Sequence, residues 1–242
     1  MTDSTVTMST PDGPMQAFVA TPDGRPPWPA VVVLQEAFGV NGHIRDVCRR
    51  LANAGFVALA PELYHRDAAG VEVDYTDFPS ARKYLAEVTN DGLTTDLRAS
   101  LAHLRSSSSV DSAHVGVVGF CMGGFAAFLA ACRTDAAAIV VLYGGGIIHA
   151  RPGLKMAPLL EEANRISAPL LCIFGEKDTG IPLEHVEAIR TRLQDLGKTH
   201  EVVVYPEAGH GFLCLERASY HEAAATQAWQ RLIDWFDRSL RG

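Results

Sequence analysis

The sequence predicts an α/β protein with a mostly parallel central sheet, helices on both faces of it and an antiparallel hairpin at the N-terminus. The first observation is a series of short apolar runs rich in Val and Ile, bounded by Gly or Pro, as expected of strands buried on both faces of a parallel sheet. The second is that segments with helical spacing lie between these runs, so that strand and helix alternate. The runs cover residues 30–35, 56–61, 114–120, 138–144, 169–175 and 201–206.

The remaining elements follow from the same kinds of signal. Residues 5–22 alternate apolar and polar side chains around Pro11-Asp12-Gly13, which predicts the hairpin. Residues 68–91 are the least regular stretch and are a candidate for a helical excursion that covers a site. No shift in composition divides the chain, so we expect one domain over residues 1–242. Helices are predicted at residues 42–55, 92–107, 124–133, 182–197 and 219–241.

Composition narrows the class of protein. The 242 residues are 48% hydrophobic and 20% charged, which is ordinary for a globular protein large enough to fold without a disulfide or a metal. A net charge of −7 argues against nucleic acid as a partner. The five cysteines are scattered and form no C-x-x-C pair, as in a reduced cytoplasmic protein. We expect no membrane span, no cofactor and no metal, and a monomer or small homo-oligomer.

The motif GFCMGG, residues 119–124, follows a predicted strand and opens a predicted helix. This is the setting of the nucleophile elbow of α/β-hydrolases, with Cys121 as the nucleophile. The turn is so tight that neighbouring positions need glycine, and the backbone N–H of Met122 would face the developing oxyanion. The alternative is a structural cysteine in a glycine-rich turn, and the glycines alone do not decide between the two.

Two polar residues at later strand ends favour the nucleophile. Asp178 follows the strand at 169–175, and His210 follows the strand at 201–206. Because the carboxyl ends of parallel strands share one edge, both are expected near Cys121, in the chain order of an α/β-hydrolase triad. His210 would take the thiol proton, and Asp178 would orient the imidazole. Taken singly, Asp178 could equally be a loop acid at a helix start, and His210 a hydrogen-bonded turn histidine.

A further carboxylate, Glu36, ends the first parallel strand. In this fold the loop after that strand supplies the second oxyanion donor, here the N–H of Ala37. A carboxylate beside that donor would repel the oxyanion, so spacing alone favours a solvated loop acid.

Taken together, the stretches LQEAFGVN, APELYHR, GFCMGG, GEKDTGIP and EAGHGFLCLERASYHEAAATQAW resemble the dienelactone hydrolase family of α/β-hydrolases. The resemblance runs from about Met8 to the last helix. It implies a triad of Cys121, His210 and Asp178, with no cofactor. It also implies that Glu36 holds the resting thiol protonated until substrate displaces the carboxylate. The thiolate then attacks a lactone or ester carbonyl, an enolate or alkoxide leaves, and water hydrolyses the thioester.

The same family binds a substrate carboxylate with two arginines, and the sequence departs from that pattern. Arg82 is the nearest candidate for the first, whereas the position of the second is Cys214. Whether Arg217, three residues further on, reaches the pocket is left open. Loss of that guanidinium would weaken the binding of a carboxylate-bearing substrate by about 2 kcal/mol or more. The expected pocket walls are Phe38, Tyr64 and Phe212, although Phe38 and Tyr64 could equally be ordinary core residues.

The leading hypothesis is therefore a cysteine-dependent hydrolase of small lactones or esters. The neutral Cys214 favours the alternative of a carboxylesterase or thioesterase that acts on uncharged acyl groups. A non-catalytic ligand-binding protein on the same fold is a third possibility, and a redox role of Cys121 a fourth. Both are less favoured, because the triad and elbow glycines are all present and no resolving cysteine lies nearby in the sequence.

Overall fold

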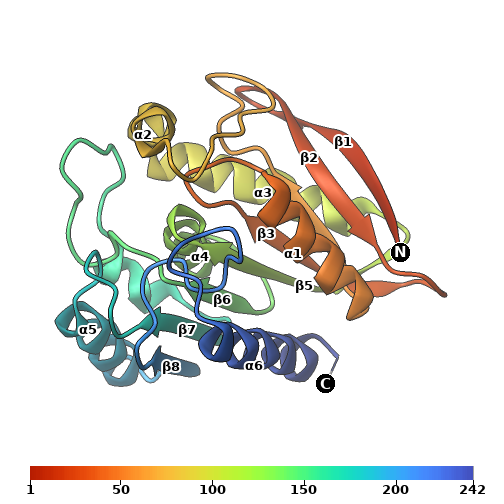
Figure 1. The fold of residues 1–242 in the computed structure, drawn as a ribbon. Coiled ribbons are helices and arrows are strands. Elements are labelled where there is room, and N and C mark those ends of the chain that lie inside the picture. Colours follow the sequence, from red (N-terminus) through yellow and green to blue (C-terminus); the bar gives the residue numbers. More distant parts are fainter. Residues whose placement is uncertain (242) are drawn as a thin grey trace.

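The computed structural model describes residues 1–241, and its centre is one eight-stranded sheet (Figure 1). The strand order is β1-β2-β4-β3-β5-β6-β7-β8. The hairpin β1–β2 is antiparallel, β2 pairs antiparallel with β4, and all later pairs are parallel, which confirms the predicted fold class. The strands are β1 (Thr2–Thr10), β2 (Gly13–Thr21), β3 (Trp28–Leu34), β4 (Val57–Pro61), β5 (Val110–Phe120), β6 (Ile139–Leu142), β7 (Leu170–Gly175) and β8 (His200–Tyr205).

Helices cover both faces of the sheet (Figure 1). Helices α1 and α6 pack on one face, while α3 and α4 pack on the other. Helix α1 begins where the Asn41 side chain accepts a hydrogen bond from the N–H of Ile44, and Gly55 follows its end with φ +87°. The helices are α1 (Gly42–Asn53), α2 (Phe78–Glu87), α3 (Asn90–Ser106), α4 (Met122–Arg133), the 3₁₀ helix η1 (Leu160–Arg165), α5 (Leu183–Asp195) and α6 (Glu222–Leu240).

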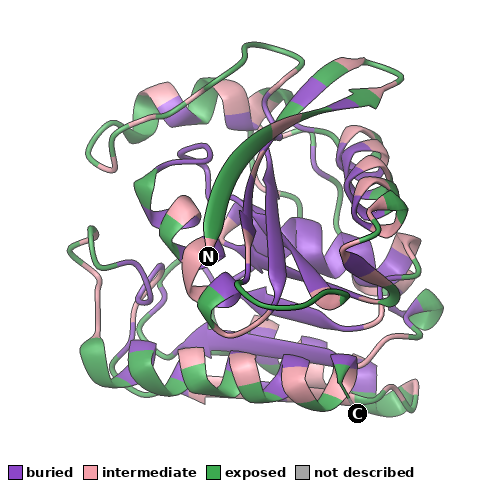
Figure 2. Ribbon diagram, turned by 90° about the vertical axis from the view of Figure 1, so that its right-hand side faces the viewer, coloured by how far each residue is buried: buried purple, intermediate pink, exposed green. Residues whose placement is uncertain are grey.

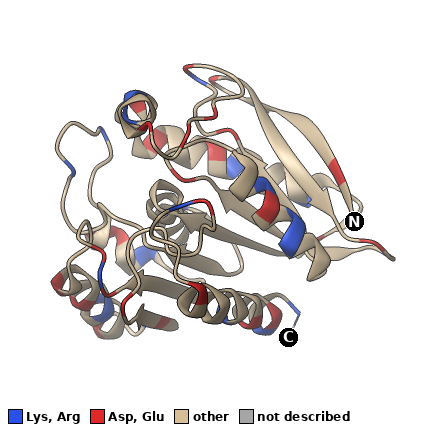
Figure 3. Ribbon diagram, viewed as in Figure 1, with Lys and Arg blue, Asp and Glu red and all other residues tan. Residues whose placement is uncertain are grey.

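The core lies on both sides of the central strands. Figure 2 shows these strands as buried, whereas β1 at the sheet edge is largely exposed. Charged residues gather on the outer helices and loops, and β3, β4, β6 and β7 carry none (Figure 3). No helix among residues 1–241 combines the length and the apolar character that crossing a membrane requires.

The parallel topology places four predicted site residues at one edge of the sheet. Glu36 follows β3, Cys121 follows β5, Asp178 follows β7 and His210 follows β8. These strands are parallel neighbours or next neighbours, so their carboxyl ends open to the same side. The periodicity that predicts the strands therefore also determines where the polar side chains meet.

Candidate active site

Cys121 occupies the sharp turn between β5 and α4, with a backbone of φ +56° and ψ −110°. A side chain other than glycine rarely adopts a positive φ, and holding it there costs about 1–3 kcal/mol. The turn is possible because its neighbours have no Cβ. A Cβ on Gly119 would lie 1.8 Å from the carbonyl oxygen of Gly123, and one on Gly123 would lie 2.2 Å from that of Leu34. The predicted elbow is therefore present, with the strain concentrated at the cysteine.

The predicted base and acid, His210 and Asp178, are held together by a hydrogen bond. Nδ1 of His210 lies 2.7 Å from Oδ2 of Asp178, whose side chain is completely buried. The other carboxylate oxygen of Asp178 accepts a hydrogen bond from the N–H of Gly180 at 2.9 Å. The Ser219 hydroxyl donates to the His210 carbonyl at 2.6 Å, and the ring of Tyr143 packs edge-on against the imidazole. With Nδ1 engaged by Asp178, only Nε2 of the imidazole remains for the thiol.

The electrostatics of this pair favour its charged form. Burial raises the pKa of the Cys121 thiol, but the charge of His210, a hydrogen bond with it and the charge of Arg217 outweigh burial and lower that pKa below its ordinary value. Burial likewise lowers the pKa of His210, yet the Cys121 thiolate and Asp178 together raise it to about 10. A thiolate on Cys121 and an imidazolium on His210 would therefore stabilise each other.

The two predicted oxyanion donors, Met122 and Ala37, lie on backbone segments that a hydrogen bond joins. The N–H of Gly123 donates to the carbonyl of Gln35 at 2.9 Å, which ties the elbow to the loop after β3. The hydroxyl of Tyr64 donates to the carbonyl of Ala37 at 2.9 Å. Tyr64 is itself buried, at 2% exposure, so it supports this loop from within, as expected for the alternative of a core residue. Met122 is the first residue of α4, where backbone N–H groups have no partner inside the helix.

Glu36 is fully buried, which corrects the expectation of a solvated loop acid. Its Oε1 lies 2.9 Å from Nη1 of Arg217, and its Oε2 accepts a hydrogen bond from the hydroxyl of Tyr75 at 2.9 Å. Arg217 thus reaches the site, which answers the open question about its reach. The carboxylate is paired with a guanidinium and not with the Cys121 thiol, unlike the resting arrangement that the resemblance implies. Charge-assisted hydrogen bonds of this kind are stronger than any a thiol donates.

The two predicted pocket phenylalanines differ in their surroundings: Phe38 lies beside Arg217, whereas Phe212 lies in the core. Phe38 is buried beside Tyr75, with ring centroids 4.7 Å apart, and the guanidinium of Arg217 lies over both rings. Phe212 is 0% exposed and packs against the rings of Tyr143 and Tyr205, so it belongs to the core beneath the base and is not an exposed pocket wall.

Arg82 is an exposed residue of α2, and its Nη2 donates to the carbonyl of Pro152 at 2.8 Å. Its observed hydrogen bond is thus to a loop carbonyl and not to Glu36 or a triad residue. Sequence reasoning missed Tyr75, whose only signal was its place in the irregular stretch 68–91. It also missed Arg151, whose Nη2 donates at 3.0 Å to the carbonyl of Gly180, two residues beyond Asp178.

A mostly parallel sheet with a strained residue on the strand-to-helix elbow, followed by an acid and a histidine at later strand ends, defines an α/β-hydrolase. Within that class the chain belongs to the dienelactone hydrolase family, whose model, described as "Dienelactone hydrolase family", matches residues 15–240. The protein is accordingly a hydrolase.

Individual relatives agree with this assignment. A protein of Synechocystis sp. named "Putative carboxymethylenebutenolidase" is 38% identical over 93% of this chain and 92% of its own length. A protein of Bradyrhizobium sp. named "Probable 2-oxo-3-(5-oxofuran-2-ylidene)propanoate lactonase" is 31% identical over 93% of this chain and 90% of its own. The crystal structure of a Klebsiella pneumoniae protein described as "Putative Dienelactone Hydrolase" superposes with a TM-score of 0.86 at 35% identity, over 98% of this chain and 99% of the other.

Proposed function

We propose that the protein hydrolyses small lactones or esters through a thioester on Cys121. The observation that carries the proposal is the strained cysteine on the elbow, paired with a histidine that a buried aspartate orients at 2.7 Å. The thiolate attacks the substrate carbonyl, and the imidazolium of His210 gives its proton to the leaving enolate or alkoxide. The same imidazole then takes a proton from the water that cleaves the thioester.

The backbone N–H groups of Met122 and Ala37 are the proposed oxyanion donors. Two features support this assignment. Met122 is the first residue of α4, so its amide lies at the positive end of the helix dipole. The loop that carries Ala37 is tied to the elbow through Gln35 and Gly123 and held from within by Tyr64, so both donors belong to one rigid piece of backbone.

The substrate class that we favour is an enol lactone that carries a carboxylate. The names of the Synechocystis and Bradyrhizobium relatives refer to such lactones. In this chain Arg217, in place of Cys214, is the candidate partner for the substrate carboxylate, since its guanidinium is partly exposed beside the rings of Phe38 and Tyr75. A substrate that binds Arg217 would release Glu36, which would then be free to turn toward the thiol.

Uncharged esters or thioesters are the second candidate class. The observation that favours them is that Glu36 already neutralises Arg217, while Cys214 carries no charge. A carboxylate-bearing enol lactone and its methyl ester separate the two classes. If the free acid has the higher kcat/KM, and Arg217→Gln removes that preference, the lactone acid is the substrate class. An unchanged or reversed preference favours uncharged substrates.

The covalent step is tested by trapping. Wild-type protein is mixed with an activated aryl ester, quenched with acid and measured by intact mass, and the acyl adduct is then mapped by peptide. We expect the adduct on Cys121 and no hydrolysis by Cys121→Ala. Cys132→Ala is the matched control, because Cys132 lies near the end of the same helix α4 and is expected to leave turnover unchanged. Turnover by Cys121→Ala would show that the nucleophile is another group.

A further inference from the structure

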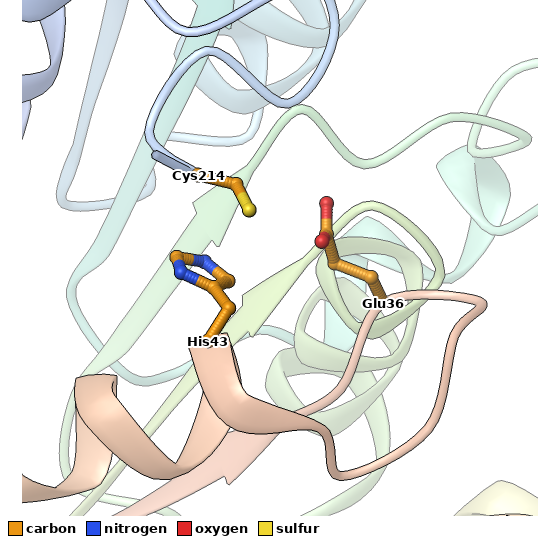
Figure 4. A group of neighbouring side chains, drawn as sticks. All are labelled: Glu36, His43 and Cys214. Carbon is orange, nitrogen blue, oxygen red and sulfur yellow. The ribbon is translucent and has the colours of Figure 1, made fainter. Parts of the chain in front are cut away.

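Three metal-ligating side chains meet behind the active site, from segments far apart in the chain. Figure 4 shows Glu36 from the loop after β3, His43 from the first turn of α1 and Cys214 from the loop after His210, with their side chains turned toward one another. One ligand atom from each lies within 4.8 Å of the others, and all three residues are buried. The sequence has no metal-ligand spacing here, because the three residues come together only in the fold.

His43 supplies a second, independent observation. It is 94% buried, and its Nε2 has no hydrogen-bond partner among residues 1–241. A buried polar atom without a partner costs about 1–3 kcal/mol, so it calls for an explanation. An imidazole nitrogen beside a thiol and a carboxylate is the donor set that Zn²⁺ and similar borderline-soft cations prefer.

A surface pocket borders this cluster at His43. A surface pocket of about 350 Å³ is lined by His43 itself and by Leu213 and Leu215, which flank Cys214 in the chain. Asp46 and Arg50 also line this pocket, so it carries charges of both signs. An ion would therefore meet the cluster through His43, from a pocket whose lining contains neither Arg217 nor a predicted triad residue.

We propose that Glu36, His43 and Cys214 form a binding site for a zinc-class divalent cation, with water as the fourth ligand. Tetrahedral zinc places its ligand atoms about 3.5 Å apart, so the three side chains must close by roughly 1 Å. On binding, the metal–sulfur bond replaces the S–H bond of Cys214, and the proton goes to solvent. The Glu36 carboxylate has lone pairs left for the ion beside its bonds to Tyr75 and Arg217.

The ion would also act on the reaction. The nearby charge of Arg217 opposes a cation, so this site is weaker than a structural zinc site, and it suits a reversible inhibitor. An ion that fixes Glu36 stops the carboxylate from turning toward the thiol. This consequence rests on the proposed function, whereas the binding itself does not.

Binding is tested with Co²⁺, which reports a thiolate ligand by its absorption, in the Cys121→Ser protein. The Cys121→Ser substitution removes the thiolate of the triad, which would compete for Co²⁺. The absorption measurement does not require an active enzyme. We expect one equivalent of Co²⁺ with a thiolate charge-transfer band. Adding Cys214→Ser should abolish the band, and adding His43→Gln should weaken binding by at least about 10-fold. Adding Cys132→Ser, the matched control, should change nothing.

A further variant is expected to increase the affinity for Co²⁺, and this test does not depend on whether Cys214→Ser folds. Tyr75→Phe removes the hydroxyl that binds Glu36 and also interacts with the Cys214 thiol, so it should tighten Co²⁺ binding. Zn²⁺ should also raise the thermal midpoint of the Cys121→Ser protein. The proposal is overturned if that protein shows no thiolate band, or if the band survives Cys214→Ser. Failure of the proposed function would instead appear as turnover by Cys121→Ala.

Discussion

Replacing Glu36 by glutamine removes one charge from the buried ion pair with Arg217 and keeps the shape of the side chain. At 2.9 Å two unit charges attract by roughly 6 kcal/mol at an effective dielectric constant of about 20. Desolvation offsets part of this attraction, and removal of one partner from a buried pair costs about 3–5 kcal/mol. Since the Arg217 side chain is 20% exposed, water can solvate it in part. We expect Glu36→Gln to lower the free energy of unfolding by about 3 kcal/mol.

Urea denaturation of both proteins near neutral pH measures this difference. The matched control is Glu161→Gln, because Glu161 pairs with Arg192 at 3.1 Å but is 89% exposed. That exposed pair should contribute less than about 1 kcal/mol. If the Glu36 variant loses no more stability than the Glu161 variant, the reasoning about burial is wrong.

The same substitution should make the thiol more reactive. The charge of Glu36 raises the pKa of Cys121, so its removal lowers that pKa further and increases the thiolate fraction at mildly acidic pH. Alkylation of Cys121 by iodoacetamide should therefore be faster in Glu36→Gln than in the wild type. A lactone substrate analogue should no longer accelerate it. Slower or unchanged labelling would contradict this role of Glu36.

Three more outcomes are expected. Asp178→Asn leaves His210 in place but loses the orientation of its ring, and should lower kcat by about 10⁴-fold in steady-state assays. Tyr64→Phe removes the hydrogen bond to the carbonyl of Ala37 and should cost about 1 kcal/mol of stability by urea denaturation. If this loop supplies the proposed oxyanion donor, the variant should also lower kcat by a larger factor than it raises KM. The pH profile of kcat/KM should rise as Cys121 ionises, below the ordinary range of a thiol, and fall as His210 loses its proton near pH 10. Since Asp178 helps to raise the pKa of His210, the high-pH limb should move to lower pH in Asp178→Asn, and an unmoved limb would contradict that assignment.

The sequence by itself determined the sheet and the positions of the triad candidates. Apolar runs bounded by Gly or Pro predicted strands that the structure contains, because burial on both faces leaves a local signal in each segment. Gly119 and Gly123 were predictable for the same reason: a tight turn excludes a Cβ whatever surrounds it. Once the strands are parallel, Cys121 and His210 come to one edge without further information.

Only the tertiary structure decided which side chains pair behind that edge. Arg217 lies 181 residues from Glu36 in the chain, and Tyr75 comes from the irregular stretch before α2. No local sequence spacing therefore predicts their contacts with the Glu36 carboxylate. The surroundings of Phe212 and Arg82 were not predictable from the sequence for a related reason. A loop residue can turn toward a pocket, the core or solvent, and that choice depends on packing against distant segments and on which charged partner lies within reach.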